Sequence, residues 1–131
     1  MTGFANLAQR TYSWPLTAII STTDATATTI FSVVIPPTTT VFITADVAAR
    51  RTGGSSGTAE DGAAYKIYGA FKNVSGSATL IGQGTTFVAE DQVAWGISFS
   101  VTADTAILQV TGAANNNINW TATYQSGTRA S

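Results

Sequence analysis

Residues 41–51, VFITADVAARR, are the stretch of sequence that decides the fold class. Every second position holds an apolar residue, namely Val41, Ile43, Ala45, Val47 and Ala49. The positions between them hold Phe42, Thr44, Asp46, Ala48 and Arg50. A period of two is the pattern of a β-strand that packs one face against a core. The stretch therefore predicts a strand whose first set of residues points inward.

The same alternation recurs on both sides of this stretch. It is clear at residues 63–73, 93–101 and 118–124, and β-branched or apolar runs occupy residues 16–22, 28–35, 79–82, 86–89 and 105–111. Turn-forming residues separate the runs, as in Pro36-Pro37, the glycine-rich loop 52–62 and the GAANNN of 112–117. About eight short, evenly spaced strands predict an all-β domain, an antiparallel β-sandwich of jelly-roll-like type, over residues 16–125.

The two ends of the chain lack this pattern. Residues 1–15 are expected to form a short irregular arm, and residues 126–131 a polar tail that frays. Four large apolar residues of the arm have no clean period and are candidate interface anchors: Phe4, Leu7, Tyr12 and Trp14. The arm either docks on a partner or packs on its own domain and closes the edge of the sandwich.

Composition excludes most kinds of chemistry. The chain has neither His nor Cys, so it lacks the commonest general base, the commonest metal ligands and any disulfide. Charged residues make up 10% of the sequence, against roughly 25% in a typical soluble domain. The net charge of −1 gives no sign of a nucleic-acid or anionic-membrane partner. No run approaches the roughly 20 apolar residues of a membrane span, and the start of the chain lacks the apolar core of a signal peptide. We therefore expect no enzyme activity, cofactor or metal, and synthesis in a host cytoplasm.

Two acidic pairs are the remaining candidates for chemistry. Glu60-Asp61 and Glu90-Asp91 offer paired carboxylates for glycoside hydrolysis or oxygen ligands for calcium. Adjacent residues of a strand point to opposite faces, so neither pair converges readily on one ion. The favoured interpretation is that each pair keeps a loop-to-strand junction solvated.

The adjacent bases Arg50 and Arg51 have two interpretations. They end one strand and open the glycine-rich loop that carries Glu60-Asp61, so they either form a salt bridge across that loop or contact another subunit. We list both as candidate interface residues. Trp95 and Trp120 alternate with small or polar neighbours and are expected in the core.

Several short marks occur in one order along residues 40–124. They are ARRTGG at 49–54, TLIG at 79–82, ED at 90–91 before Trp95, and TGAANNNINW at 111–120. In these marks the chain resembles a β-domain of tailed-bacteriophage structural proteins, found at the ends of fibre proteins and in capsid-associated proteins.

The resemblance implies a virion protein that assembles as a homotrimer and has no catalytic role. About fifteen residues precede the first strand, which is too few for a fibre shaft and favours a capsid cement or decoration protein. Such a protein would bind the major capsid protein on the outer capsid surface and stabilise the assembled shell by mass action. The alternative is a receptor-binding tip of a tail or head fibre, with aromatic side chains stacked on host glycans.

Overall fold

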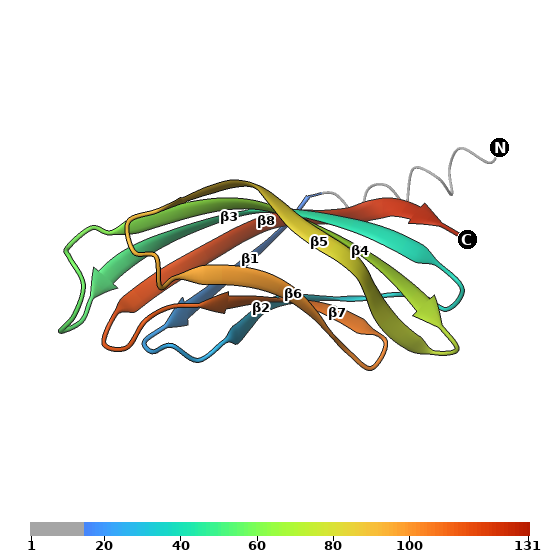
Figure 1. The fold of residues 1–131 in the computed structure, drawn as a ribbon, viewed down its shortest axis with the longest axis horizontal. Helices are drawn as coiled ribbons and strands as arrows, with labels where there is room; N and C mark the ends of the chain where they lie inside the picture. Colours follow the sequence, from blue (N-terminus) through green and yellow to red (C-terminus); the bar gives the residue numbers. More distant parts are fainter. Residues whose placement is uncertain (1–14) are drawn as a thin grey trace.

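The computed structural model describes residues 15–131, and this part of the chain consists of β-strands joined by turns and loops (Figure 1). The strands are β1 (Leu16–Thr22), β2 (Thr28–Val34), β3 (Thr40–Gly53), β4 (Gly62–Val74), β5 (Ser77–Glu90), β6 (Gly96–Thr102), β7 (Thr105–Thr111) and β8 (Asn117–Ala130). No helix long and apolar enough to cross a membrane occurs within these residues.

The strands form two antiparallel sheets that face each other. The larger sheet has the order β1-β8-β3-β4-β5 and the smaller one the order β2-β7-β6. Figure 1 shows the larger sheet as an arch over the smaller one. This confirms the predicted all-β antiparallel sandwich. The pairing of β1 with β8 and of β2 with β7 gives the jelly-roll-like roll, whereas β3 pairs with its sequence neighbour β4 in the same sheet.

The core lies between the two sheets and is built from the inward positions of the alternating pattern. The five apolar residues predicted to point inward from residues 41–51 are all buried. Trp120 is fully buried, and its indole nitrogen donates a hydrogen bond to the Thr22 hydroxyl at 2.9 Å. Trp95 packs against it with ring centroids 6.0 Å apart. Both tryptophans therefore belong to the core, as the sequence indicated.

Three segments differ from the sequence-based expectation. The two short strands expected at 79–82 and 86–89 are one continuous strand, β5, whose register with β4 shifts at two bulges. Val93 was expected to begin a core strand, but β6 begins at Gly96 and the Val93 side chain is 90% exposed. Residues 126–130, expected to fray, extend β8 because Phe42, Val41 and Thr40 pair with Thr128, Arg129 and Ala130.

The glycine-rich loop between β3 and β4 is held down by hydrogen bonds. The Arg51 guanidinium donates to the carbonyl oxygens of Gly54 and Ser56, and the Ser56 amide donates to the carbonyl of Asn115. Gly54 has φ +113°, and a Cβ there would lie 2.1 Å from the Asn115 oxygen. The loop therefore packs against the β7–β8 turn in a way that requires glycine.

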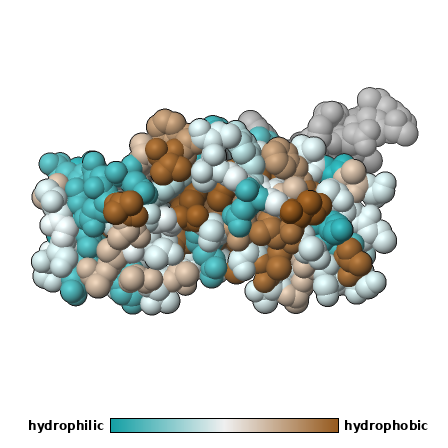
Figure 2. Space-filling model, in the orientation of Figure 1, coloured by the Kyte–Doolittle hydropathy of each residue, from teal (hydrophilic) through white to brown (hydrophobic). Residues whose placement is uncertain are grey.

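The two sheets are also joined at one edge by a side chain. The Gln83 amide on β5 accepts from the Phe99 backbone N–H at 2.7 Å and donates to the Phe99 carbonyl at 3.1 Å. It thereby takes the place of a neighbouring strand beside β6. Figure 2 shows hydrophobic side chains at the surface on this side of the molecule, where β5 and β6 lie in front.

Candidate binding site

The candidate site lies on the outer face of the larger sheet, the side turned away from the smaller sheet. It is formed by the outward positions of β3, β4 and β8, because alternate residues of a strand point to opposite faces. Register places Thr44 between Tyr68 and Gln125, and it places Asp46 between Lys66 and Thr123. Residues far apart in the sequence thus form two rows across neighbouring strands.

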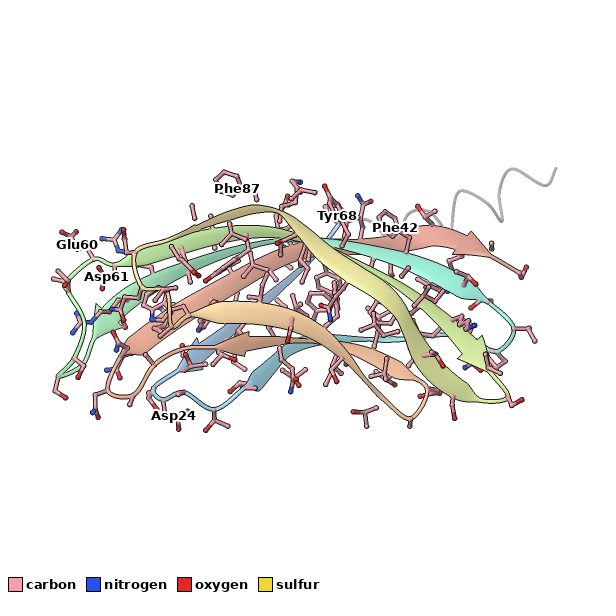
Figure 3. The ribbon with its side chains drawn as sticks, in the orientation of Figure 1. Asp24, Phe42, Glu60, Asp61, Tyr68 and Phe87 are labelled. Atoms are coloured by element: carbon pink, nitrogen blue, oxygen red, sulfur yellow. The ribbon has the colours of Figure 1, made fainter. Side chains whose placement is uncertain are left out.

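Three aromatic side chains rise from this face. Phe42 on β3, Tyr68 on β4 and Phe87 on β5 all point away from the core (Figure 3). Phe42 and Tyr68 stack with ring centroids 5.8 Å apart and planes 21° from parallel. Phe42 is 42% exposed and Phe87 55% exposed. Aromatic rings present flat apolar area at little conformational cost, and such rings stack on flat partners.

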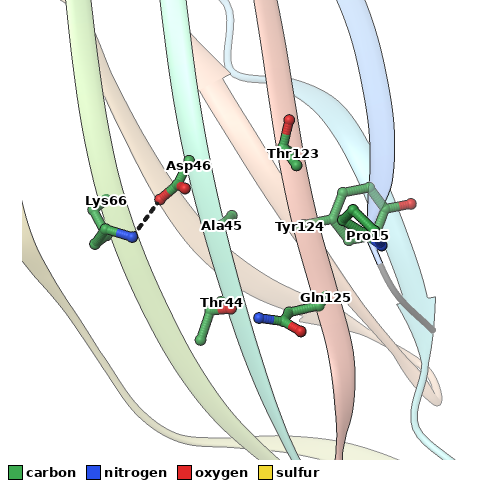
Figure 4. Close-up of a pocket in the computed structure, with 8 residues that line it drawn as sticks. All are labelled: Pro15, Thr44, Ala45, Asp46, Lys66, Thr123, Tyr124 and Gln125. Carbon is green, nitrogen blue, oxygen red and sulfur yellow. Dashed lines mark ion pairs between the residues drawn. The ribbon is translucent and has the colours of Figure 1, made fainter. Parts of the chain in front are cut away.

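A polar hollow lies beside the Phe42–Tyr68 pair. Its lining is Pro15, Thr44, Ala45, Asp46, Lys66, Thr123, Tyr124 and Gln125 (Figure 4). The lining offers three hydroxyls, a carboxamide, a carboxylate and an ammonium group, which together provide both donors and acceptors of hydrogen bonds. A flat apolar surface next to hydrogen-bonding groups suits a ligand that has both a flat apolar face and polar groups at its rim.

One ion pair spans the hollow. Lys66 Nζ lies 2.8 Å from Asp46 Oδ1, and both side chains are about half exposed or more. The hydrogen bond from Lys66 to Asp46, followed by the attraction between their charges, raises the pKa of Lys66. The pair neutralises itself, so the hollow carries no excess charge toward a ligand.

The four acidic residues singled out from the sequence meet at the opposite end of the same sheet but are each engaged. Glu60 pairs with Arg50 at 2.8 Å, and Glu90 accepts a hydrogen bond from the Tyr65 hydroxyl at 2.7 Å. Asp91 accepts from the Gly62 amide at 2.8 Å. Within residues 15–131 no three acidic side chains are grouped so as to hold a metal ion.

Asp61 is the most strongly bound of these carboxylates. It accepts hydrogen bonds from the Gln92 side chain and from the Thr58 amide. These two hydrogen bonds, with a smaller contribution from the Arg51 charge, lower the pKa of Asp61.

Burial raises the pKa of Tyr65, and its hydrogen bond to Glu90 adds to that effect. These groups brace the loop and the strand ends.

Both arginines predicted as interface candidates make contacts inside their own chain. Arg50 forms the salt bridge across the glycine-rich loop, and Arg51 binds two carbonyls of that loop. An inter-subunit role for either stays a prediction. The other candidates, Phe4, Leu7, Tyr12 and Trp14, lie outside the described residues.

Sequence reasoning did not single out Phe42, Tyr68 or Phe87. The signal was present, because Phe42 and Tyr68 occupy outward positions of clearly alternating strands, where small or polar residues are usual. Two large aromatics on a predicted solvent face indicate a candidate interaction surface.

The comparison with solved structures finds phage tailspike proteins. Over 93% of its length the chain is similar to the Acinetobacter baumannii phage AM24 tailspike protein, with a TM-score of 0.56 and 6% identity. A weaker likeness is to the tailspike of Acinetobacter phage vB_ApiP_P1, with a TM-score of 0.44 and 11% identity over 86% of the chain. Another is to the tailspike gp49 of Acinetobacter baumannii bacteriophage Fri1, a capsular polysaccharide depolymerase, with a TM-score of 0.38 and 9% identity over 86% of the chain.

The chain spans 28%, 22% and 17% of the lengths of these three tailspikes. No family model and no curated protein sequence matches it. At 6% identity the AM24 likeness shows a shared fold, that of a β-domain present in a phage tailspike.

Proposed function

We propose that this chain is a non-enzymatic β-domain of a phage tail protein, and that the outer face of its larger sheet binds host-surface glycan. The observation that carries the proposal is the stacked pair of exposed Phe42 and half-buried Tyr68 beside the polar hollow. A sugar ring has an apolar face suited to stacking and a rim of hydroxyls that donate and accept hydrogen bonds. The two halves of the site match these two sides.

The fold likeness supports a tail role over the capsid-cement role that we expected from the sequence. The similar protein is a tailspike, and nothing in the comparisons favours a capsid protein. The self-neutralised Lys66–Asp46 pair favours neutral sugar units over strongly anionic ones. The absence of His from the chain, and the use of the loop carboxylates in hydrogen bonds, favour binding without hydrolysis.

The test is binding to an array of purified bacterial capsular and lipopolysaccharide oligosaccharides, followed by NMR titration of labelled protein with any hit. We expect shifts confined to the outward residues of β3, β4 and β8. Tyr68→Ala should abolish binding, whereas Tyr68→Phe keeps the ring and should retain most of it.

Two results would contradict the proposal. Shifts that map elsewhere, or an array without any hit, would remove the glycan site. Stoichiometric binding of the full chain to phage shells that lack tails would instead restore the cement role.

A further inference from the structure

The free edge of β5 is unprotected. Among the described residues β5 pairs only with β4, so one side of its backbone has no strand beside it. Residues 79–89, TLIGQGTTFVA, contain no charge and no proline, which are the usual means of blocking an edge strand. Bulges, which also protect edges, occur at Ile81 and Thr86 and leave residues 82–85 between them in regular pairing with β4. By contrast, the nearby edge of β6 is covered by the Gln83 amide.

The same edge carries exposed apolar side chains. Ile81, Phe87 and Val88 are each more than half exposed. β5 runs along the side of the molecule on which Figure 2 shows hydrophobic atoms at the surface. An apolar strand with unpaired backbone groups is a template for another strand.

The pattern along β5 is complementary to itself. Counted in the register that β4 imposes, Thr79, Gly82, Gly84, Phe87 and Ala89 share the outer face, since their partners on β4 do. When the bulged residues Ile81 and Thr86 are left out of the pairing, as they are with β4, antiparallel pairing of two β5 strands about Gly84 places Phe87 of each copy opposite Gly82 of the other. On the inner face it places Leu80 opposite Val88, so that apolar groups meet.

The glycines leave room for the phenylalanine. A Cβ at Gly82 or Gly84 would meet nothing within 4 Å. Gly82 and Gly84 line a shallow apolar hollow together with Tyr68. Phe87 and the hollow at Gly82 and Gly84 lie at different places on the same strand. Phe87 can therefore fill this hollow only on a second copy of the chain.

Charges at the two ends of the strand are complementary in this arrangement. Lys72 lies opposite Thr79 at one end and forms no ion pair with any carboxylate of the described chain. Glu90 and Asp91 lie at the other end. Two-fold pairing brings the Lys72 end of each copy to the acidic end of the other, and no like charges meet along the strand.

We propose that β5 pairs with β5 of a second copy of this chain, antiparallel about a two-fold axis at Gly84, with Phe87 of each copy seated over Gly82 of the other. The contact leaves Thr44, Asp46 and Gln125 of the polar hollow uncovered, because they lie on β3 and β8, whereas Tyr68 lines the hollow at Gly82 and Gly84 and belongs to both surfaces. By itself it makes a dimer, whereas the resemblance to fibre domains implied a trimer.

Cross-linking of the full chain tests the axis directly, because the chain has no cysteine of its own. Gly84→Cys puts two thiols opposite each other and should give a disulfide-linked dimer under mild oxidation. Gly82→Cys, which faces Phe87, and Ile19→Cys, on the other edge of the sheet, should not cross-link. Mixing Gly82→Cys with Phe87→Cys should link the two different chains.

Sedimentation at micromolar concentration supplies the second readout. The unmodified chain should have the mass of two chains, and Gly84→Lys should have the mass of one because it places two ammonium groups at the axis. The open space at Gly84 lets the folded monomer accept the lysine, which circular dichroism checks, and Phe87→Lys serves if it does not. Ile19→Lys is the control that should stay dimeric.

The proposal fails if the unmodified chain is a monomer, if Gly84→Lys leaves the oligomer intact, or if Gly84→Cys cross-links no better than Ile19→Cys. A trimer that survives both lysine variants on β5 would place self-association on another surface.

Discussion

The two faces of β3 and β4 are built from neighbouring residues and have opposite roles. The inward face is a closed apolar layer in which Ile43 and Phe71 are fully buried. The outward face, one residue away along the same strands, carries the stacked Phe42–Tyr68 pair and the Lys66–Asp46 ion pair. The inward face accounts for the core, whereas the outward aromatics lie outside the core and support the proposed binding role.

The largest expected effect separates two adjacent residues. Ile43→Ala should lower the free energy of unfolding by about 2–5 kcal/mol, because it opens a cavity in a fully buried site. Phe42→Ala should cost about 1 kcal/mol or less, since it removes an exposed stacking partner. Urea denaturation measures both, and equal costs would mean that the outer face is structural.

Two glycines on neighbouring strands provide a second contrast. A Cβ at Gly69 would lie 2.7 Å from atoms of both Phe71 and Phe99, so Gly69→Ala should destabilise the domain by about 1–3 kcal/mol through overpacking. Gly84→Ala points into open space and should change stability by about 0.5 kcal/mol or less. Thermal denaturation of the two variants compares them, and a neutral Gly69→Ala would show that the sheets do not meet as closely as described.

The Gln83 amide, on the inner face at the edge, should contribute an intermediate amount. Gln83→Ala leaves the Phe99 N–H and carbonyl without their partner and should cost about 1–3 kcal/mol. Thr85→Ala, the next inward position of β5, is the matched control. Hydrogen exchange should be accelerated at the Phe99 amide in Gln83→Ala alone, and unchanged exchange there would argue against side-chain capping of β6.

The smallest expected effect is a pH dependence at the loop end of the sheet. The pKa of Asp61 is lowered in the folded protein, so its hydrogen bonds stabilise the fold above the ordinary Asp value of 3.8, and this stability is lost as the pH falls through the folded pKa. Asp61→Asn should therefore be less stable than the parent at neutral pH, with a difference that disappears in acid. Gln92→Ala removes the hydrogen bond that lowers the pKa of Asp61 most, so it should reduce the same pH dependence. A difference that is constant with pH would exclude the linkage.

The fold could be predicted from the sequence because alternation is a local signal. The alternation in residues 41–51 indicates which side of the strand faces the core, even when the partner strand is not known. The same rule fails at Val93, since the alternation continues past the true start of β6 into an exposed loop. It also fails at residues 126–130, where polar composition conceals a strand that is held by its pairing with β3.

The candidate site could not be predicted in the same way, because it depends on register between distant strands. Thr44, Lys66 and Gln125 come together only after β3 has been placed between β4 and β8. Composition did narrow the chemistry, since a chain without His or Cys indicated binding over catalysis. To recognise the outward aromatics as a candidate site, one must also know that no other element covers their face of the sheet.

The placement of β8 between β1 and β3 has a consequence for how the chain folds. Leu16 pairs with Tyr124, and Ala49 pairs with Trp120, so the larger sheet is completed between β1 and β3 by the last of the eight described strands to be synthesised. Until then β1 has no neighbour and one edge of β3 stays open. A topology dominated by such distant pairings folds slowly, in milliseconds to seconds for domains of this kind. Synthesis thus passes through a stage with several unsatisfied strand edges, during which low charge offers little protection against aggregation.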